Sequence, residues 1–257
     1  MISTTRVLWS VKLKSYPAIF RPIAHLRENS KRRVVRPDSD VVIEGYWRCG
    51  NHFATYAFMV AQQRPVAIAH HFHAPAQLML AVRWGVPAVL LIREPIEAVA
   101  SATIYLHRQD PGSFLKFYQL FHRAVVGLAD RVVVSDFPTT VGDFGAVIEA
   151  LNARYHRQCL PFAGDDDQRA AVERMIREEH AENMGAIQSQ LPLPSEEKSR
   201  LKRQVIERMH EPRYAQLLAD AQGLYRQLAA YAISSPTSAA DAFAGSITTG
   251  DDQSSAS

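Results

Sequence analysis

The sequence contains little cysteine and no long apolar run, and each absence excludes a class of protein. Among its 257 residues only Cys49 and Cys159 are cysteines, far apart and in no paired motif. A disulfide framework and a cysteine-based zinc site are therefore disfavoured, as is typical of a reducing cytosol. Because no stretch of about 18 apolar residues occurs, we expect no membrane span. The N-terminus also lacks the apolar core of a signal peptide, so we expect a cytoplasmic protein.

An excess of charge of one sign is also lacking. The formal net charge is only +3, which disfavours a nucleic-acid partner. The positive charge is concentrated in residues 1–38, which are rich in lysine and arginine and poor in acids. We interpret this basic N-terminal segment as a solvated, partly ordered lead-in. The alternative is electrostatic docking onto an anionic substrate or the surface of a membrane.

After the basic segment, short apolar strands alternate with helices. Strands are predicted at 41–45, 66–69, 86–92 and 131–134, and helices at 53–62, 76–84, 114–129 and 144–155, with another helix opened by Pro95. This alternation favours βαβ units and a three-layer α/β fold with a central parallel sheet. Residues 165–231 are predicted to be helical, with an interruption at 191–194 and a helix cap at Ser195. Residues 234–257 are predicted to be a disordered tail, which leaves 39–233 as one α/β domain.

Gly45 and Gly50 bracket a loop between the first strand and the first helix. Backbone N–H groups in such a turn, beside a helix N-terminus, favour an anion. A nucleoside triphosphatase loop needs Lys and then Ser or Thr after the second glycine, and here those positions hold Asn51 and His52. The cation lies inside the loop instead, at Arg48. Hydrolysis of ATP or GTP is therefore disfavoured.

The segment 46–53 resembles the 5′-phosphosulfate loop of the sulfotransferase family, which usually reads aromatic, Pro, Lys or Arg, Ser, Gly, Thr, Thr, Trp. Arg48 and Gly50 match, and Phe53 stands where the family has an aromatic residue that stacks on adenine. The positions that depart from Ser, Thr and Thr are Cys49, Asn51 and His52. The asparagine amide can still donate to a phosphate oxygen, as can the histidine when its donor nitrogen faces it, whereas the thiol is a weak donor.

A second segment, 90–101, resembles the 3′-phosphate motif of the same family. That motif is an apolar strand, an arginine, a short turn, and a helix with a serine eight positions after the arginine; Arg93 and Ser101 match it. Taken singly, Arg93 reads as a strand cap and Ser101 as a packing residue. The order of the two motifs, about 45 residues apart, favours a shared phosphate held by both side chains.

Three histidines stand between the two motifs, in the run His70-His71-Phe72-His73. The family often places its general base here, and His71, 22 residues before Arg93, fits that spacing. Imidazole suits the role because its pKa lies near neutral pH. His73 is the second candidate, and His70 is expected to point away. The alternatives are a structural cluster and a zinc site, the latter disfavoured because no Asp, Glu or Cys lies in the run.

The resemblance implies a P-loop NTPase-like enzyme that moves a sulfuryl group from 3′-phosphoadenosine 5′-phosphosulfate (PAPS) to a hydroxyl, with no metal required. For the acceptor we expect a carbohydrate or lipid-linked sugar, because the basic N-terminal segment would suit an anionic molecule. The oligomeric state stays open. The family's basic segment near the C-terminus has no clear counterpart, although Lys198, Arg200 and Arg203 could substitute. The alternatives are a P-loop kinase or other nucleotide phosphotransferase, and a non-catalytic nucleotide-binding protein of the same fold.

Overall fold

Four short parallel strands form the central sheet of this computed structural model, which describes residues 12–25, 32–106, 110–184 and 196–233. The strands are β1 (Val41–Gly45), β2 (Ile68–His70), β3 (Ala88–Ile92) and β4 (Val133–Asp136), in the order β2-β1-β3-β4. Ile43 pairs with His70 and Gly45 with Leu91, so the carboxyl ends of neighbouring strands lie at one edge. The strands are almost entirely buried, as expected of a parallel sheet covered on both faces.

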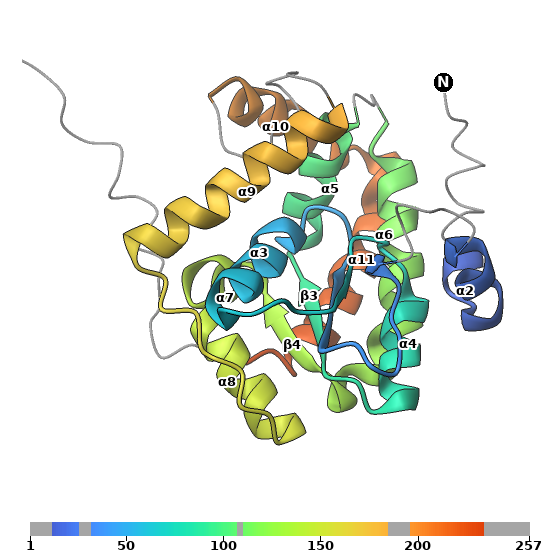
Figure 1. The fold of residues 1–257 in the computed structure, drawn as a ribbon. Coiled ribbons are helices and arrows are strands. Elements are labelled where there is room, and N and C mark those ends of the chain that lie inside the picture. Colours follow the sequence, from blue (N-terminus) through green and yellow to red (C-terminus); the bar gives the residue numbers. More distant parts are fainter. Residues whose placement is uncertain (1–11, 26–31, 107–109, 185–195, 234–257) are drawn as a thin grey trace, which may run out of the picture.

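Helices lie on both faces of the sheet (Figure 1). One face is covered by α3 (Asn51–Gln62), α7 (Phe137–Gly142) and α8 (Phe144–Tyr155), and the other by α4 (Pro75–Trp84), α6 (Gly112–Val125) and α11 (Ala215–Ala229). Outside these, α5 (Pro95–Tyr105) packs on α6 and α11, α9 (Asp166–Met184) on α3, α10 (Glu196–Met209) on α5, and α2 (Pro17–His25) on α4. The predicted α/β fold with a central parallel sheet is confirmed, and the arrangement is compatible with three layers.

An aromatic cluster on α6 anchors the chain where it leaves β1. Tyr46 is fully buried, and its ring centre lies 5.3 Å from that of Phe117 and 5.0 Å from that of Tyr118. Its hydroxyl donates to the carbonyl oxygen of Phe114 at 3.1 Å, which satisfies the one polar atom that burial takes from water. The start of the loop after β1 is therefore fixed to a helix far along the sequence.

Several element boundaries differ from the sequence-based prediction. The predicted strand at 41–45 and helix at 144–155 are confirmed, whereas the helix predicted at 114–129 ends at Val125 and continues as a 3₁₀ helix over Val126–Arg131. The basic N-terminal segment contains α2, which was not predicted. Phe20 and Ala24, one helical turn apart, are buried against Phe72 and its neighbours. The interruption at 191–194, Ser195 and the tail 234–257 lie outside the described residues.

The last described residues extend the sheet beyond β4. Ala232 forms a parallel bridge with Val134, and the N–H of Ile233 donates to the carbonyl oxygen of Val134 at 3.0 Å. Across the described ranges, none of the helices has both the length and the apolar character needed to cross a bilayer.

Candidate functional site

The candidate site lies where the chain leaves β1 and β3 in opposite directions. The loop after β1 enters α3 on one face of the sheet, whereas the turn after β3 enters α5, which packs with α6 and α11 on the other face. These two strands are neighbours in the sheet. In an open parallel sheet such a reversal leaves a crevice at the carboxyl ends of the strands, where ligands bind.

Both glycines of the loop have a steric reason to be glycine. A Cβ on Gly45 would lie 2.5 Å from the carbonyl oxygen of Leu91, so a side chain there would push β1 away from β3. Gly50 has a φ of 91°, and a Cβ there would lie 3.2 Å from Cγ2 of Thr140. The spacing of the two glycines therefore follows from the packing of the strand and the helix as well as from any ligand.

The loop presents backbone donors beside the N-terminus of α3. Within the described part of the chain, the N–H groups of residues 47–50 donate to no protein acceptor. A carboxylate or phosphate is the natural partner for such donors at a helix start. The side chain of Asn51 donates to the carbonyl oxygen of Tyr46 at 3.0 Å, so it closes the loop on itself. The thiol of Cys49 is buried, and burial raises its pKa to about 12, which keeps it neutral.

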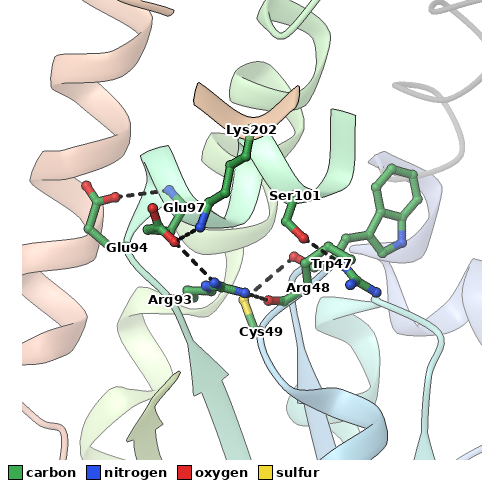
Figure 2. A network of polar contacts seen from close by, with 8 residues as sticks. All are labelled: Trp47, Arg48, Cys49, Arg93, Glu94, Glu97, Ser101 and Lys202. Atoms are coloured by element: carbon green, nitrogen blue, oxygen red, sulfur yellow. Dashed lines mark hydrogen bonds and ion pairs between the residues drawn. The ribbon is translucent and has the colours of Figure 1, made fainter. Parts of the chain in front are cut away.

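Figure 2 shows how Arg48, Arg93 and Ser101 converge. Nε of Arg48 donates to the hydroxyl of Ser101 at 3.0 Å, and Arg93 donates to the carbonyl oxygen of Arg48 at 2.9 Å. Arg48 therefore bridges the two residues of the second motif, which make no hydrogen bond to each other in the described structure. The two sequence motifs do form one site.

Glu97 of α5 adds an acid to this group. One carboxylate oxygen lies 3.2 Å from a guanidinium nitrogen of Arg93 and also forms an ion pair with Lys202 of α10 (Figure 2). The carboxylate of Glu94 caps α5 by accepting from the N–H of Glu97 at 3.2 Å. The site thus combines three cations with one directly paired carboxylate.

The two guanidinium groups are held firmly. Arg93 lies over the ring of Phe137, 3.8 Å from its centre, and its carbonyl oxygen accepts from the hydroxyl of Tyr118 at 2.8 Å. Arg48 lies 5.0 Å from the ring centre of Tyr105. Burial, and then the charge of Arg93, lowers the pKa of Arg48 to about 10, so it stays charged at neutral pH. Two neighbouring cations of this kind favour an anion between them.

The histidines form a second cluster beside the loop. Nδ1 of His70 lies 2.5 Å from Nδ1 of His71, and the ring centres of His52 and His71 are 4.0 Å apart. Nδ1 of His73 donates to the carbonyl oxygen of Gly45 at 2.9 Å. The expectation that His70 points away is wrong, because its ring contacts His71. Nε2 of His71 is buried and has no hydrogen-bond partner in the described structure.

Burial keeps these imidazoles neutral. It lowers the pKa of His52 to about 4 and the pKa values of His70 and His73 to about 3, and it holds the pKa of His71 well below its ordinary value. The positive charges of the neighbouring histidines, when present, act in the same direction on His71. Each neutral ring therefore carries one acceptor lone pair at pH 7, and in the pair of His70 and His71 one of these lone pairs accepts the hydrogen bond between the rings.

Two acids near the histidines were missed by sequence reasoning. Glu44 is fully buried in β1 and accepts from the N–H groups of Phe72 at 3.1 Å and Ala74 at 2.7 Å, so it holds the turn after β2. Burial raises its pKa to about 7. Glu179 of α9 faces His52, with 3.4 Å between Oε2 and Nε2. Glu44 could have been found from the sequence, because an acid inside an apolar strand is unusual. Nothing in the local sequence around Glu179 indicates that it lies near the histidines.

The remaining predicted residues take other positions. Phe53 packs edge-on against Phe144 and Phe162, with ring centres 6.4 and 5.9 Å apart. On α10 the cation that reaches the site is Lys202, whereas Arg200 and Arg203 are exposed. The side chain of Lys198 lies outside the described part. Among the described residues, no group of three or more His, Cys, Asp or Glu side chains is arranged to hold a metal ion.

Comparison of the chain with protein-family models, with curated proteins and with solved structures finds no match.

Proposed function

We propose that this protein is a sulfotransferase of P-loop type that transfers a sulfuryl group from PAPS to a hydroxyl. The observation that carries the proposal is the loop of residues 45–50: its N–H groups at 47–50 lack protein acceptors, and it meets Arg93 and Ser101 at the carboxyl edge of the sheet. A donor with phosphate groups at two positions fits two anion-binding motifs in one crevice.

The residues of the crevice fit the two ends of such a donor. The amides of residues 47–50 and the guanidinium of Arg48 suit the 5′-phosphosulfate, and Arg93 with Ser101 suits the 3′-phosphate. When the bond between sulfur and the bridging oxygen breaks, Arg48 neutralises the charge that remains on that oxygen. Asn51 contributes through the shape of the loop, since its side chain donates to Tyr46.

His71 is the proposed general base, and the structure supports a choice of nitrogen. Its Nδ1 is engaged with His70, whereas Nε2 has no hydrogen-bond partner in the described structure. In the tautomer in which Nδ1 of His71 donates to His70, Nε2 carries the lone pair. As the acceptor oxygen bonds to sulfur, Nε2 takes the hydroxyl proton. The ring of His52 lies against His71, so an acceptor must displace or pass this ring to reach Nε2. The depressed pKa of His71 keeps the lone pair available at neutral pH.

The acceptor belongs to the proposal only as a class. The basic N-terminal segment suits an anionic molecule, which supports a carbohydrate or lipid-linked sugar with a free hydroxyl. Asn51 and His52 do not supply the lysine and hydroxyl with which a kinase loop holds ATP and Mg²⁺, and neither side chain is free for that task, since Asn51 bonds Tyr46 and His52 pairs with Glu179.

The experiment is a thermal-unfolding titration with 3′,5′-adenosine bisphosphate, beside ADP with Mg²⁺. A ligand at about 100 times its Kd adds roughly 2.7 kcal/mol, which for a chain of this size raises Tm by roughly 5–10 °C. We expect this rise with the bisphosphate alone. The rise is expected to vanish in Arg93→Ala and to persist in His71→Ala, because the imidazole serves the acceptor.

The other outcomes choose between the alternatives. A rise with ADP and Mg²⁺ but not with the bisphosphate would support a phosphotransferase and overturn the proposal. No rise with either ligand would indicate a protein that has the fold without the donor site.

A further inference from the structure

The carboxylate of Glu97 lies on the two outer cations of the proposed 3′-phosphate site. The same oxygen, Oε2, pairs with Arg93 at 3.2 Å and with Nζ of Lys202 (Figure 2). The three residues come from the end of β3, the first turn of α5 and the middle of α10. A side-chain oxygen between a guanidinium and an ammonium occupies the position that a phosphate oxygen takes in an anion site.

The charges of the site favour a stronger anion than this carboxylate. Arg48, Arg93 and Lys202 are cations, and Glu97 is the carboxylate that contacts two of them. A carboxylate carries a single charge and has two oxygens. A phosphate monoester carries a charge of about −1.5 to −2 near pH 7 and offers three oxygens. It can therefore satisfy more of the donors than the carboxylate does.

The exposed fractions of the three side chains indicate which residue leaves the ion pairs when an anion binds. The side chain of Glu97 is 39% exposed and that of Lys202 28%, whereas that of Arg93 is 15% exposed. Arg93 is also fixed by the carbonyl oxygen of Arg48 and by the ring of Phe137. When Glu97 turns toward solvent it takes its charge into water, so its departure leaves no buried anion behind.

We propose that Glu97 is an internal counter-ion that occupies the phosphate site of the ligand-free protein, and that a ligand's phosphate monoester displaces it from Arg93 and Lys202. This inference rests on the proposed function and adds Lys202 to the donor site. The ligand class is a nucleotide with a phosphate on the ribose 3′ position. Nucleotides without that group leave the ion pairs of Glu97 in place.

Glu97 can be tested without disturbing the helix that carries it. The N–H of Glu97 is capped by the carboxylate of Glu94, a backbone contact that does not involve the side chain of Glu97. Glu97→Gln keeps the shape of the side chain and removes its charge. Glu207→Gln, which removes an exposed acid of α10 outside the network of Figure 2, is the matched control for Glu97→Gln. Arg203→Met, on the exposed face of α10, is the control for Lys202→Met.

The test is calorimetric titration of the full chain with 3′,5′-adenosine bisphosphate and with adenosine 5′-monophosphate, which lacks the 3′ group. In Glu97→Gln we expect bisphosphate binding to tighten about two- to fivefold, the size expected for a partly exposed ion pair. Lys202→Met is expected to weaken it by a similar factor. Monophosphate binding is expected to stay the same in both variants, and both controls are expected to match the wild type.

The outcomes separate this inference from the function on which it rests. If the wild type binds the bisphosphate but Glu97→Gln binds it equally or less well, the displacement is overturned and the donor site stands. Equal changes for the monophosphate would also overturn it, because the effect would then not depend on the 3′ group. If the wild type does not bind the bisphosphate, the proposed function and this inference both fail. Glu97→Ala is a second variant, in which bisphosphate binding is also expected to tighten.

Discussion

Strained backbone positions concentrate at the carboxyl edge of the sheet. Five non-glycine residues of the described part have positive φ. Two of them, Gln63 and His156, end α3 and α8, a position where the left-handed conformation is common. The other three are Arg48, His71 and His73, with φ of 65°, 59° and 50°. Left-handed conformations away from helix ends persist where surrounding contacts impose them, and such positions often belong to functional sites.

Gly50, two residues after Arg48, provides a test of the packing at this edge of the sheet. Gly50→Ala is expected to lower the free energy of unfolding by about 1–2 kcal/mol for its left-handed backbone alone. The nearby Cγ2 of Thr140, 3.2 Å from the new Cβ, is expected to increase the loss. Gly85→Ala is the matched control, because Gly85 has a φ of 69° and nothing within 4 Å of its Cβ position. Urea unfolding of both variants measures the difference. An equal loss in the free energy of unfolding for both variants would show that the side chain of Thr140 moves aside without destabilising the protein.

At the scale of elements, a carboxylate of α9 links this helix to α3, beside the buried apolar side chains of Val172 and Ile176. Glu179 accepts from the hydroxyl of Tyr56 at 2.7 Å and from Arg33 at 3.0 Å, and it faces His52. Its side chain is 13% exposed, whereas that of Arg33 is 40% exposed. The bond to the tyrosine therefore contributes more than the ion pair, because solvent screens exposed charges. Through His52 this contact also positions the ring that lies on His71.

Glu179→Ala is expected to lower the free energy of unfolding by about 1–3 kcal/mol, since it removes the charged acceptor of the hydrogen bond from the hydroxyl of Tyr56. Hydrogen exchange is expected to quicken in α9 and in the first turn of α3. Glu178→Ala, an exposed neighbour on the same helix, is the control and is expected to change little. Unaltered exchange in Glu179→Ala would show that apolar packing alone holds α9.

The sequence predicts the elements that carry the loop better than the elements that close over it. The apolar run 41–45 and the glycines of the loop are local signals, and Arg93 with Ser101 follows from their spacing across one turn. Glu179 and Lys202 reach the site from helices more than a hundred residues along the chain. On their own helices they look like any solvated charge, so their role depends on tertiary packing that periodicity does not encode.

At the scale of the whole molecule, buried ionisable groups link stability to pH. Burial lowers the pKa values of His52, His70, His73 and His122 to about 4, 3, 3 and 4. Between about pH 6.5 and these values the unfolded chain binds protons that the folded chain refuses, so stability falls on acidification. Glu44, with its pKa raised to about 7, acts in the opposite direction between about pH 4.5 and 7. Because four imidazoles destabilise the folded state on acidification and one carboxyl stabilises it, we expect the net free energy of unfolding to fall.

We therefore expect the urea midpoint of the wild type to be lower at pH 5 than at pH 7. His122→Gln, which removes one of the buried imidazoles, is expected to reduce this dependence. Midpoints measured across this range at constant ionic strength check both statements. A midpoint that is constant or rises on acidification would mean that the histidines gain protons in the folded state as easily as in the unfolded chain.

The position of Trp47 has an optical consequence. Its indole stacks on Phe117, with ring centres 4.5 Å apart, and meets His73 edge-on at 5.9 Å, so one chromophore contacts both the loop and the histidine turn. The chain has two other tryptophans, Trp9 and Trp84. With both replaced by phenylalanine, the tryptophan emission of the protein, excited at a wavelength where its nine tyrosines do not absorb, comes from Trp47 alone. Its intensity and wavelength then follow the arrival of a ligand at the loop in real time, without a dye or a label.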